Sequence, residues 1–168
     1  MFLLIDGYNL AFEVGWLTPR QRGAGALERA RNRLLSFLEH SLDEKERTRT
    51  TVVFDAWQMP VDGAAEQQHA SVKVVFAVEY DEADELIEEL IATHSSPKSL
   101  TVVSSDRRLV SAAQRRKATA LKSSEWYEAT LRDRAKKNSQ PLSKDELAKR
   151  GSTKIPPAER DYWLEEFS

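Results

Sequence analysis

Short apolar runs alternate with longer amphipathic segments along this chain, and no other feature of the sequence limits its possible folds as strongly. Five runs rich in Val, Leu, Phe or Thr are predicted as strands, over residues 2–6, 49–57, 72–78, 99–105 and 118–123. Uninterrupted apolar runs suit strands that are buried on both faces, as in a parallel sheet. Helix-length segments separate most of the runs. The alternation predicts an α/β fold with a central, mostly parallel sheet of four or five strands and helices on both faces.

The segments between the runs have the periodicity of amphipathic helices. In residues 26–42 the side chains of Leu27, Ala30 and Leu34 recur at helical spacing. The outward face of this helix is predicted to carry three arginines, Arg29, Arg31 and Arg33. Further helices are predicted from about residue 82, over 107–116 and over 123–137. Residues 59–71 contain a proline and an Asp-Gly pair, so we predict a loop there.

The composition narrows the class of protein. A chain of 168 residues has the length of one domain with an appendage, and its lack of cysteine excludes disulfides, thiolate metal sites and cysteine nucleophiles. No apolar run has the roughly 18 residues of a membrane span, and the N-terminus does not have the pattern of a signal peptide. We expect a soluble, cytoplasmic protein without a membrane partner, and nothing in the sequence indicates an oligomeric state.

The formal net charge of −2 conceals two opposed segments. Residues 80–90 carry six acids and no base, whereas residues 132–154 carry eight Lys or Arg against three acids. Each segment alone also fits a solvated surface or a linker, but together they fit an enzyme that uses a metal ion on a polyanion. Because the amino-acid composition becomes polar, basic and rich in proline beyond residue 136, we predict a domain over 1–136. Residues 137–168 are then a basic linker followed by a short C-terminal helix.

Acidic residues stand where the predicted strands end. Asp6, Asp55 and Asp106 follow three of the apolar runs, and Asp84 lies in the first turn of the acidic helix. In a parallel α/β sheet these positions meet at the edge formed by the carboxyl ends of the strands, where ligands bind. Each acid also has a structural explanation. Asp106 suits a helix N-cap, Asp55 can cap a turn, and Asp84 is favoured by the positive end of its helix.

If the carboxylates meet, their mutual repulsion raises their pKa values unless a cation joins them. A set of oxygen ligands without His or Cys selects Mg²⁺ or Mn²⁺, and the three histidines (His40, His69 and His94) have no ligand spacing. Such an ion can orient or deprotonate a water for attack on a phosphodiester. Asn9, one turn beyond Asp6, can hold a water or a phosphate oxygen without adding charge. Ser104 and Ser105 can do the same beside Asp106, or make ordinary hydrogen bonds at a strand end.

Four segments in order, LLIDGYNLAF, TVVFDAW, DEADELIEELI and LTVVSSDRRLVSAA, resemble the NYN domain, a branch of the PIN-like nuclease superfamily, and within it the bacterial YacP-like group. The resemblance covers about residues 2–130, and the IDGYN motif is its most diagnostic part. It implies a PIN-like three-layer α/β/α sandwich and a ribonuclease that depends on Mg²⁺ or Mn²⁺. Members of the group include ribosome-associated endoribonucleases that cut messenger RNA, so the resemblance implies RNA and the ribosome as partners.

The resemblance also assigns roles by position. It implies that Asp6 is the metal ligand of the first strand, with Asn9 as its companion. It implies that Asp84 and Asp106 are the other catalytic acids and metal ligands, and that Asp55 is an auxiliary ligand. The family often has a glycine after the acid of the second strand, whereas Ala56 and Trp57 stand here. The following loop is therefore expected to differ in shape.

An RNA enzyme needs cations that contact phosphates, because these contacts supply most of its non-specific affinity. We predict substrate-binding roles for Ser105 and for four arginines near the acids, Arg20, Arg22, Arg107 and Arg108. Tyr8 and Trp57 flank the predicted acid cluster and can stack on a base, although Tyr8 equally suits core packing.

One other class of function stays open, and two further classes are disfavoured. The chain can be a catalytically weak RNA- or ribosome-binding module whose basic segment 132–154 makes the contacts. A phosphatase of the haloacid-dehalogenase type would have a second Asp two residues after Asp6, where Tyr8 stands. A dinucleotide-binding site would need a G-x-G-x-x-G motif after the first strand, and the chain has none there.

Overall fold

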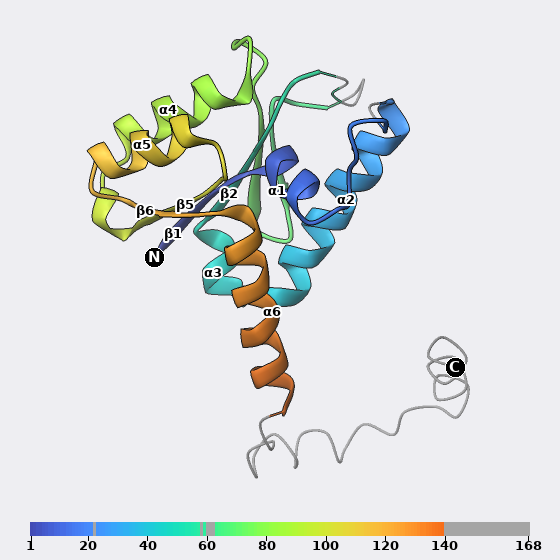
Figure 1. The fold of residues 1–168 in the computed structure, drawn as a ribbon, viewed down its shortest axis with the longest axis vertical. Coiled ribbons are helices and arrows are strands. Elements are labelled where there is room, and N and C mark those ends of the chain that lie inside the picture. Colours follow the sequence, from blue (N-terminus) through green and yellow to red (C-terminus); the bar gives the residue numbers. More distant parts are fainter. Residues whose placement is uncertain (22, 58, 60–62, 140–168) are drawn as a thin grey trace. The chain divides into compact units, whose positions relative to one another are not determined.

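A computed structural model of the chain describes residues 1–139 except 22, 58 and 60–62, and contacts group Met1–Arg134 into one compact unit. The described residues form one six-stranded sheet with the strand order β3-β4-β2-β1-β5-β6 (Figure 1). The five predicted strands are present as β1 (Phe2–Asp6), β2 (Thr50–Phe54), β4 (Val72–Phe76), β5 (Leu100–Val103) and β6 (Thr119–Leu121). Each of these five pairs in parallel with its neighbour among them, so their carboxyl ends share one edge of the sheet.

The sixth strand, β3 (Glu66–His69), is the exception to the sequence prediction. It lies within residues 59–71, which were predicted as a loop, and it pairs antiparallel with β4 at the edge of the sheet. Its sequence EQQH has no apolar residue, because an edge strand with exposed side chains does not need one. The two-residue turn to β4 consists of Ala70 and Ser71, both with positive φ (48° and 72°). This turn lacks the Asn-Gly or Asp-Gly pair that normally signals a hairpin.

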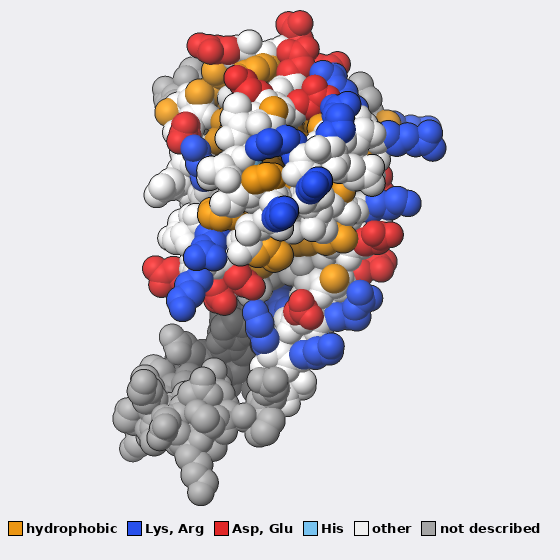
Figure 2. Space-filling model, turned by 90° about the vertical axis from the view of Figure 1, so that its left-hand side faces the viewer, with side chains coloured by type: hydrophobic (Ala, Val, Ile, Leu, Met, Phe, Trp, Pro, Cys, Tyr) orange, Lys and Arg blue, Asp and Glu red, His pale blue; other side chains and the backbone are white. Residues whose placement is uncertain are grey.

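Helices cover both faces of the sheet, which confirms the three-layer α/β/α architecture (Figure 1). One face packs against α1 (Gly7–Glu13), α2 (Ala24–Ser41) and α6 (Ser123–Ser139), and the other against α4 (Ala83–Thr93) and α5 (Arg107–Arg115). The remaining helical elements are α3 (Glu44–Thr48) and the 3₁₀ turn η1 (Pro97–Ser99). On the face of α4 and α5, acidic side chains gather at the upper end and Lys and Arg side chains spread below them (Figure 2). Helix α6 extends to Ser139, and the expected linker and C-terminal helix from residue 140 onward lie outside the described residues.

Helix α1 begins immediately after β1, without a loop between them. This tight junction depends on Gly7, because a Cβ atom at this position would lie 2.3 Å from Cε1 of the Phe54 ring. Such a distance is far inside van der Waals contact, so any larger residue would push β1 and β2 apart. The glycine of the IDGYN motif therefore lets the chain turn sharply while Asp6 and Asn9 stay close to the sheet edge.

Arg31 is not on the outward face of α2, and this prediction was wrong. Its side chain is 6% exposed, donates a hydrogen bond to the Tyr8 hydroxyl at 2.8 Å, and lies over the Phe76 ring. Arg31 falls on the same helical stripe as Leu27 and Leu34, and this stripe faces the sheet. A count of apolar residues alone does not reveal that a cation occupies one core position of the stripe. The same contacts bury Tyr8 in the core, which leaves Trp57 as the exposed aromatic of the predicted pair.

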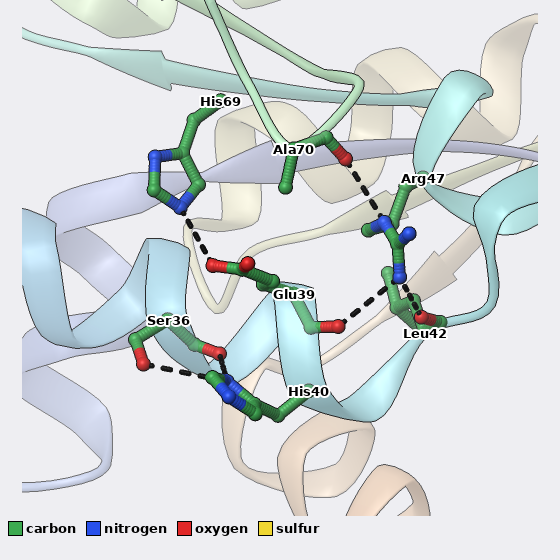
Figure 3. A network of polar contacts seen from close by, with 7 residues as sticks. All are labelled: Ser36, Glu39, His40, Leu42, Arg47, His69 and Ala70. Atoms are coloured by element: carbon green, nitrogen blue, oxygen red, sulfur yellow. Dashed lines mark hydrogen bonds and ion pairs between the residues drawn. The ribbon is translucent and has the colours of Figure 1, made fainter.

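A network of polar contacts closes the end of the sheet where β2 and β4 begin (Figure 3). Arg47 of α3 donates hydrogen bonds to three main-chain carbonyl oxygens, those of Glu39, Leu42 and Ala70, at 3.1, 2.7 and 2.9 Å. His69 of β3 contacts the Glu39 carboxylate at 3.1 Å. One cation thus joins the end of α2 to the strained turn between β3 and β4.

No helix within the described residues is both long and apolar enough to cross a membrane.

Candidate active site

The predicted acids lie at the carboxyl edge of the sheet, on four different elements. Asp6 ends β1, Asp55 follows β2, Asp84 lies in the first turn of α4, and Asp106 precedes α5. The charges of Asp55 and Asp106 act on Asp6, and those of Asp6 and Asp106 act on Asp84. The structure therefore brings the four carboxylates within electrostatic reach of one another, as the parallel sheet predicted.

Asp6 is the most deeply placed of the four, with 7% of its surface exposed. Burial raises the pKa of its carboxyl from 3.8 to about 6, and the charges of Asp55 and Asp106 act in the same direction. The Ser104 hydroxyl, which donates to Asp6 Oδ2 at 3.1 Å, opposes this shift. A buried carboxylate with a single side-chain donor lacks much of its usual solvation, so a cation at this point would stabilise it.

Asp84 and Asp106 act on each other directly. The pKa of Asp84 is raised from 3.8 to about 7, first by burial and then by a hydrogen bond shared with the Asp106 carboxyl and by the charges of Asp6 and Asp106. Asp106 is also the N-cap of α5, because its Oδ1 accepts a hydrogen bond from the Arg108 amide at 2.9 Å. The capping role and the place in the acid group are compatible, since a carboxylate has two oxygens that each accept more than one bond.

Asp55 holds the start of α4 in place. Its Oδ1 accepts a hydrogen bond from the Ala83 amide at 2.6 Å, so it caps a helix that begins 28 residues later. Asp55 was predicted either to cap a turn or to join the acids, and this hydrogen bond gives it a capping role at the start of α4. By fixing the first turn of α4, Asp55 determines where Asp84 lies relative to Asp6.

Asn9 connects three elements rather than standing free beside Asp6. Its Oδ1 accepts hydrogen bonds from the Ser105 amide at 3.0 Å and from the Ser123 hydroxyl at 2.7 Å. The Ser105 hydroxyl in turn lies 3.3 Å from the Ser123 amide. Asn9 thus ties α1 to the end of β5 and to the start of α6. The contribution of Ser123 was missed, because its only visible sequence signal was that of a helix cap.

The described part of the chain contains no group of three or more His, Cys, Asp or Glu side chains placed to hold one ion directly. Mg²⁺ does not require such a cage, since it is usually bound by one or two carboxylates and keeps several waters. The Asp84–Asp106 pair beside the buried Asp6 is an oxygen-only donor set with excess negative charge, and this set fits a hydrated Mg²⁺ or Mn²⁺ ion. His40, His69 and His94 each contact residues outside this group.

The predicted phosphate-binding residues have different surroundings. Arg107 is exposed and lines a groove of about 560 Å³ together with Ser105, Lys122 and Ser124. Arg108 makes a two-point ion pair with Glu88 of α4, with contacts of 2.5 and 3.1 Å. Arg20 is exposed, and Arg22 lies outside the described residues. Arg107 therefore has the most open access to a ligand near Asp106, and Lys122 adds a cation that the sequence argument overlooked.

The comparison with known proteins agrees with these observations. A profile of the YacP-like NYN domain matches residues 3–166. The chain belongs to the YacP-like NYN family. Membership implies nuclease activity of the ribonuclease type, and the matched range extends past residue 136, where we predicted a domain boundary. That boundary stays a prediction. No curated protein matches the chain.

Two solved structures of another family member are similar to this one. The crystal structure of the W164L mutant of Rae1 (YacP) from Bacillus subtilis has 25% sequence identity and a TM-score of 0.60, over 87% of this chain and 89% of that chain. A second crystal structure of Rae1 (YacP) from Bacillus subtilis has 24% identity and a TM-score of 0.60, over 99% and 90% of the two chains. Both crystal structures share the α/β fold described above for this chain, which confirms the predicted fold class.

Proposed function

We propose that this protein is a divalent-metal-dependent endoribonuclease that hydrolyses RNA phosphodiester bonds in the cytoplasm. The observation that supports it most strongly is the meeting of Asp6, Asp84 and Asp106, from three separate elements, at the carboxyl edge of a parallel sheet. Folding places these like charges together at a cost in stability, and a group of this kind marks a functional site more often than a structural one.

Asp84, Asp106 and Asp6 would hold a Mg²⁺ or Mn²⁺ ion, directly or through its waters, and Asp55 would act as an auxiliary acid. When bound, the ion supplies a Lewis acid for the phosphoryl oxygens and an activated water for in-line attack. The protein's own part is to fix the carboxylates. Ser104 orients Asp6, Asp55 holds the start of α4 and hence Asp84, and the capping bond of Asp106 fixes its rotamer.

The groove beside Asp106 would receive the RNA backbone. Arg107 and Lys122 offer cations to phosphate oxygens, and Ser105 and Ser124 offer hydrogen-bonding groups. Arg108, held by Glu88, would reach a phosphate only if it left that carboxylate. By resemblance to the family alone, we further propose messenger RNA at the ribosome as the substrate.

Cleavage of a labelled single-stranded RNA in Mn²⁺ or Mg²⁺ tests this proposal. We expect Asp6→Asn and Asp84→Asn to lower the cleavage rate by about a hundredfold or more, as for groups that act directly on the transition state. Glu128→Gln, which neutralises an exposed acid of α6, is the matched control and should retain the wild-type rate. Equal rates in all four proteins, or cleavage unaffected by a chelator, would refute the assignment.

A second candidate is an RNA- or ribosome-binding module with weak catalysis. The sequence feature that favours it is the basic segment 132–154, which carries eight Lys or Arg against three acids. A truncated protein ending at residue 136 distinguishes the two functions. If cleavage of a short RNA persists while binding to long RNA or ribosomes is lost, the active site and the basic segment act separately. If the full-length protein binds RNA tightly and never cuts it, the binding module is correct.

A further inference from the structure

A cavity of about 360 Å³ adjoins the acid group, and it shares no lining residue with the Arg107 groove. Its volume falls in the roughly 300–1,000 Å³ range of small-molecule sites. The cavity shares Asp55 with the acid group, so a ligand in it would lie next to the proposed reaction centre. Asp55 is proposed above as an auxiliary acid and Trp57 is predicted to stack on a base, but the cavity that they line has no assigned ligand.

Aromatic side chains make up much of the cavity wall. Trp57 and Phe12 are 62% and 37% exposed, which is unusual for residues of this size. Tyr80 stands on the loop before α4, and its hydroxyl donates a hydrogen bond to the Glu89 carboxylate, so its ring is held in place. Two exposed rings and one anchored ring around a small cavity are the platform on which an unpaired nucleobase stacks.

The charged groups of the cavity are all carboxylates. Asp81 and Glu82 are exposed at its rim, and Glu82 is the N-cap residue of α4 without using its side chain as a cap. Asp55 uses Oδ1 to hold Ala83. None of the residues that line the cavity in the described part of the chain is Lys or Arg. The cavity therefore suits a ligand that presents ring faces and N–H donors, and it disfavours a phosphate.

Guanine is the nucleobase that best meets this requirement. Its Watson–Crick edge carries two adjacent donors, N1–H and the 2-amino group, which match the two oxygens of a carboxylate. Adenine and cytosine each place a ring acceptor beside their amino group, and uracil places its single N–H between two carbonyl oxygens. These acceptors would face a carboxylate and be repelled by it.

We propose that the cavity binds an unpaired guanine of the RNA next to the scissile phosphate, stacked on Trp57 and Tyr80 and recognised by the carboxylates of Asp81 and Glu82. This inference rests on the proposed ribonuclease function and adds a base preference to it. The backbone on either side of the guanine would pass the acid group toward Arg107 and Lys122.

The test uses full-length protein and oligouridylates that carry one guanosine, adenosine, cytidine or inosine at the centre, with cleavage mapped at nucleotide resolution in Mn²⁺. We expect cleavage next to guanosine to be about tenfold or more faster than next to adenosine or cytidine, the discrimination typical of a two-point base contact. Inosine lacks the 2-amino donor and should fall between guanosine and adenosine. Glu82→Gln and Trp57→Ala should bring the guanosine-to-adenosine ratio toward one.

Two exposed α6 positions supply controls outside the cavity, and Glu128→Gln and Leu131→Ala should keep the wild-type ratio. Equal rates at all four nucleotides in an active protein would overturn the guanine site and leave the ribonuclease intact. If no RNA is cut, the ribonuclease proposal fails. Titration with guanosine or adenosine 5′-monophosphate then tests separately whether the cavity prefers guanine to adenine. Shifts of the Trp57 indole and Glu82 amide resonances at lower GMP than AMP concentration support the site, and equal responses overturn it.

Discussion

The two ends of the sheet differ in how their charged groups are paired. Where β2 and β4 begin, Arg47 is bound to three carbonyl oxygens, His69 faces Glu39, and Asp43 and Glu46 close a capping box at the start of α3. Where the parallel strands end, Asp84 and Asp106 share a hydrogen bond, and no Lys or Arg within the described residues forms an ion pair with either. The first end gains stability from its polar groups, and the second gives up stability to keep like charges together. The contrast indicates which end carries function.

We expect the largest effect from removing the three hydrogen bonds of Arg47 at the end where β2 and β4 begin. Arg47→Ala leaves the carbonyl oxygens of Glu39, Leu42 and Ala70 without their shared donor, and we expect the free energy of unfolding to fall by about 3 kcal/mol. Urea denaturation measures this loss. At a temperature where the variant is folded, RNA cleavage should stay near the wild-type rate. A stable variant that is inactive would show that the two ends are not separate in function.

The next prediction concerns Asp6, where the parallel strands end, and here the substitution should raise the free energy of unfolding. Asp6 has a raised pKa, so the folded state binds its proton more tightly than the unfolded state does. The metal-free protein therefore loses stability as the pH rises from about 4 through about 6, and the loss is complete above that. We expect Asp6→Asn to be about 3 kcal/mol more stable than the wild type at pH 8 and equal to it near pH 4.

Thermal denaturation in EDTA at the two pH values measures this difference, and added Mn²⁺ should stabilise the wild type more than the variant. If Asp6→Asn is destabilised at pH 8, the carboxylate is a structural group, and the comparison between the two ends fails.

A smaller gain is expected in the turn between β3 and β4. Ser71 has φ of 72°, a conformation that costs roughly 1–2 kcal/mol for a residue with a side chain and little for glycine. Ser71→Gly should raise the free energy of unfolding by about 1 kcal/mol without changing the cleavage rate. Calorimetry measures the change in the free energy of unfolding. Ser99→Gly, in the 3₁₀ turn before β5, is the control and should not stabilise the protein.

The smallest expected effect concerns Arg108. Its ion pair with Glu88 joins α5 to α4 at the surface, where water and salt screen the attraction between the two charges. Arg108→Ala should therefore change stability little. If Arg108 stays with Glu88, the affinity for RNA should also change little, whereas Arg107→Ala should weaken RNA binding and reduce its salt dependence. A larger loss of affinity for Arg108→Ala would show that this arginine leaves Glu88 for a phosphate.

Much of the fold follows from local patterns in the sequence. The five apolar runs became the five parallel strands, and the acids that end them met at one edge because parallel strands share a direction. The parts that were missed depend on distant partners. Strand β3 is polar and is specified by its pairing with β4, and the buried position of Arg31 depends on Tyr8 and Phe76. The predicted role of Asn9, to hold a water or a phosphate oxygen, stays a prediction, and its hydrogen-bond partner Ser123 is 114 residues away, beyond any local pattern.

Crystals of the wild type soaked in Mn²⁺ at pH 8 and measured at the manganese absorption edge would show whether an ion binds among the acids. We expect one anomalous peak among the carboxylates of Asp6, Asp84 and Asp106, and its loss in Asp84→Asn crystals. If the soaked crystals show no peak there, and Asp84 and Asp106 lie within hydrogen-bond distance of each other with no ion beside them, the metal-dependent nuclease is contradicted.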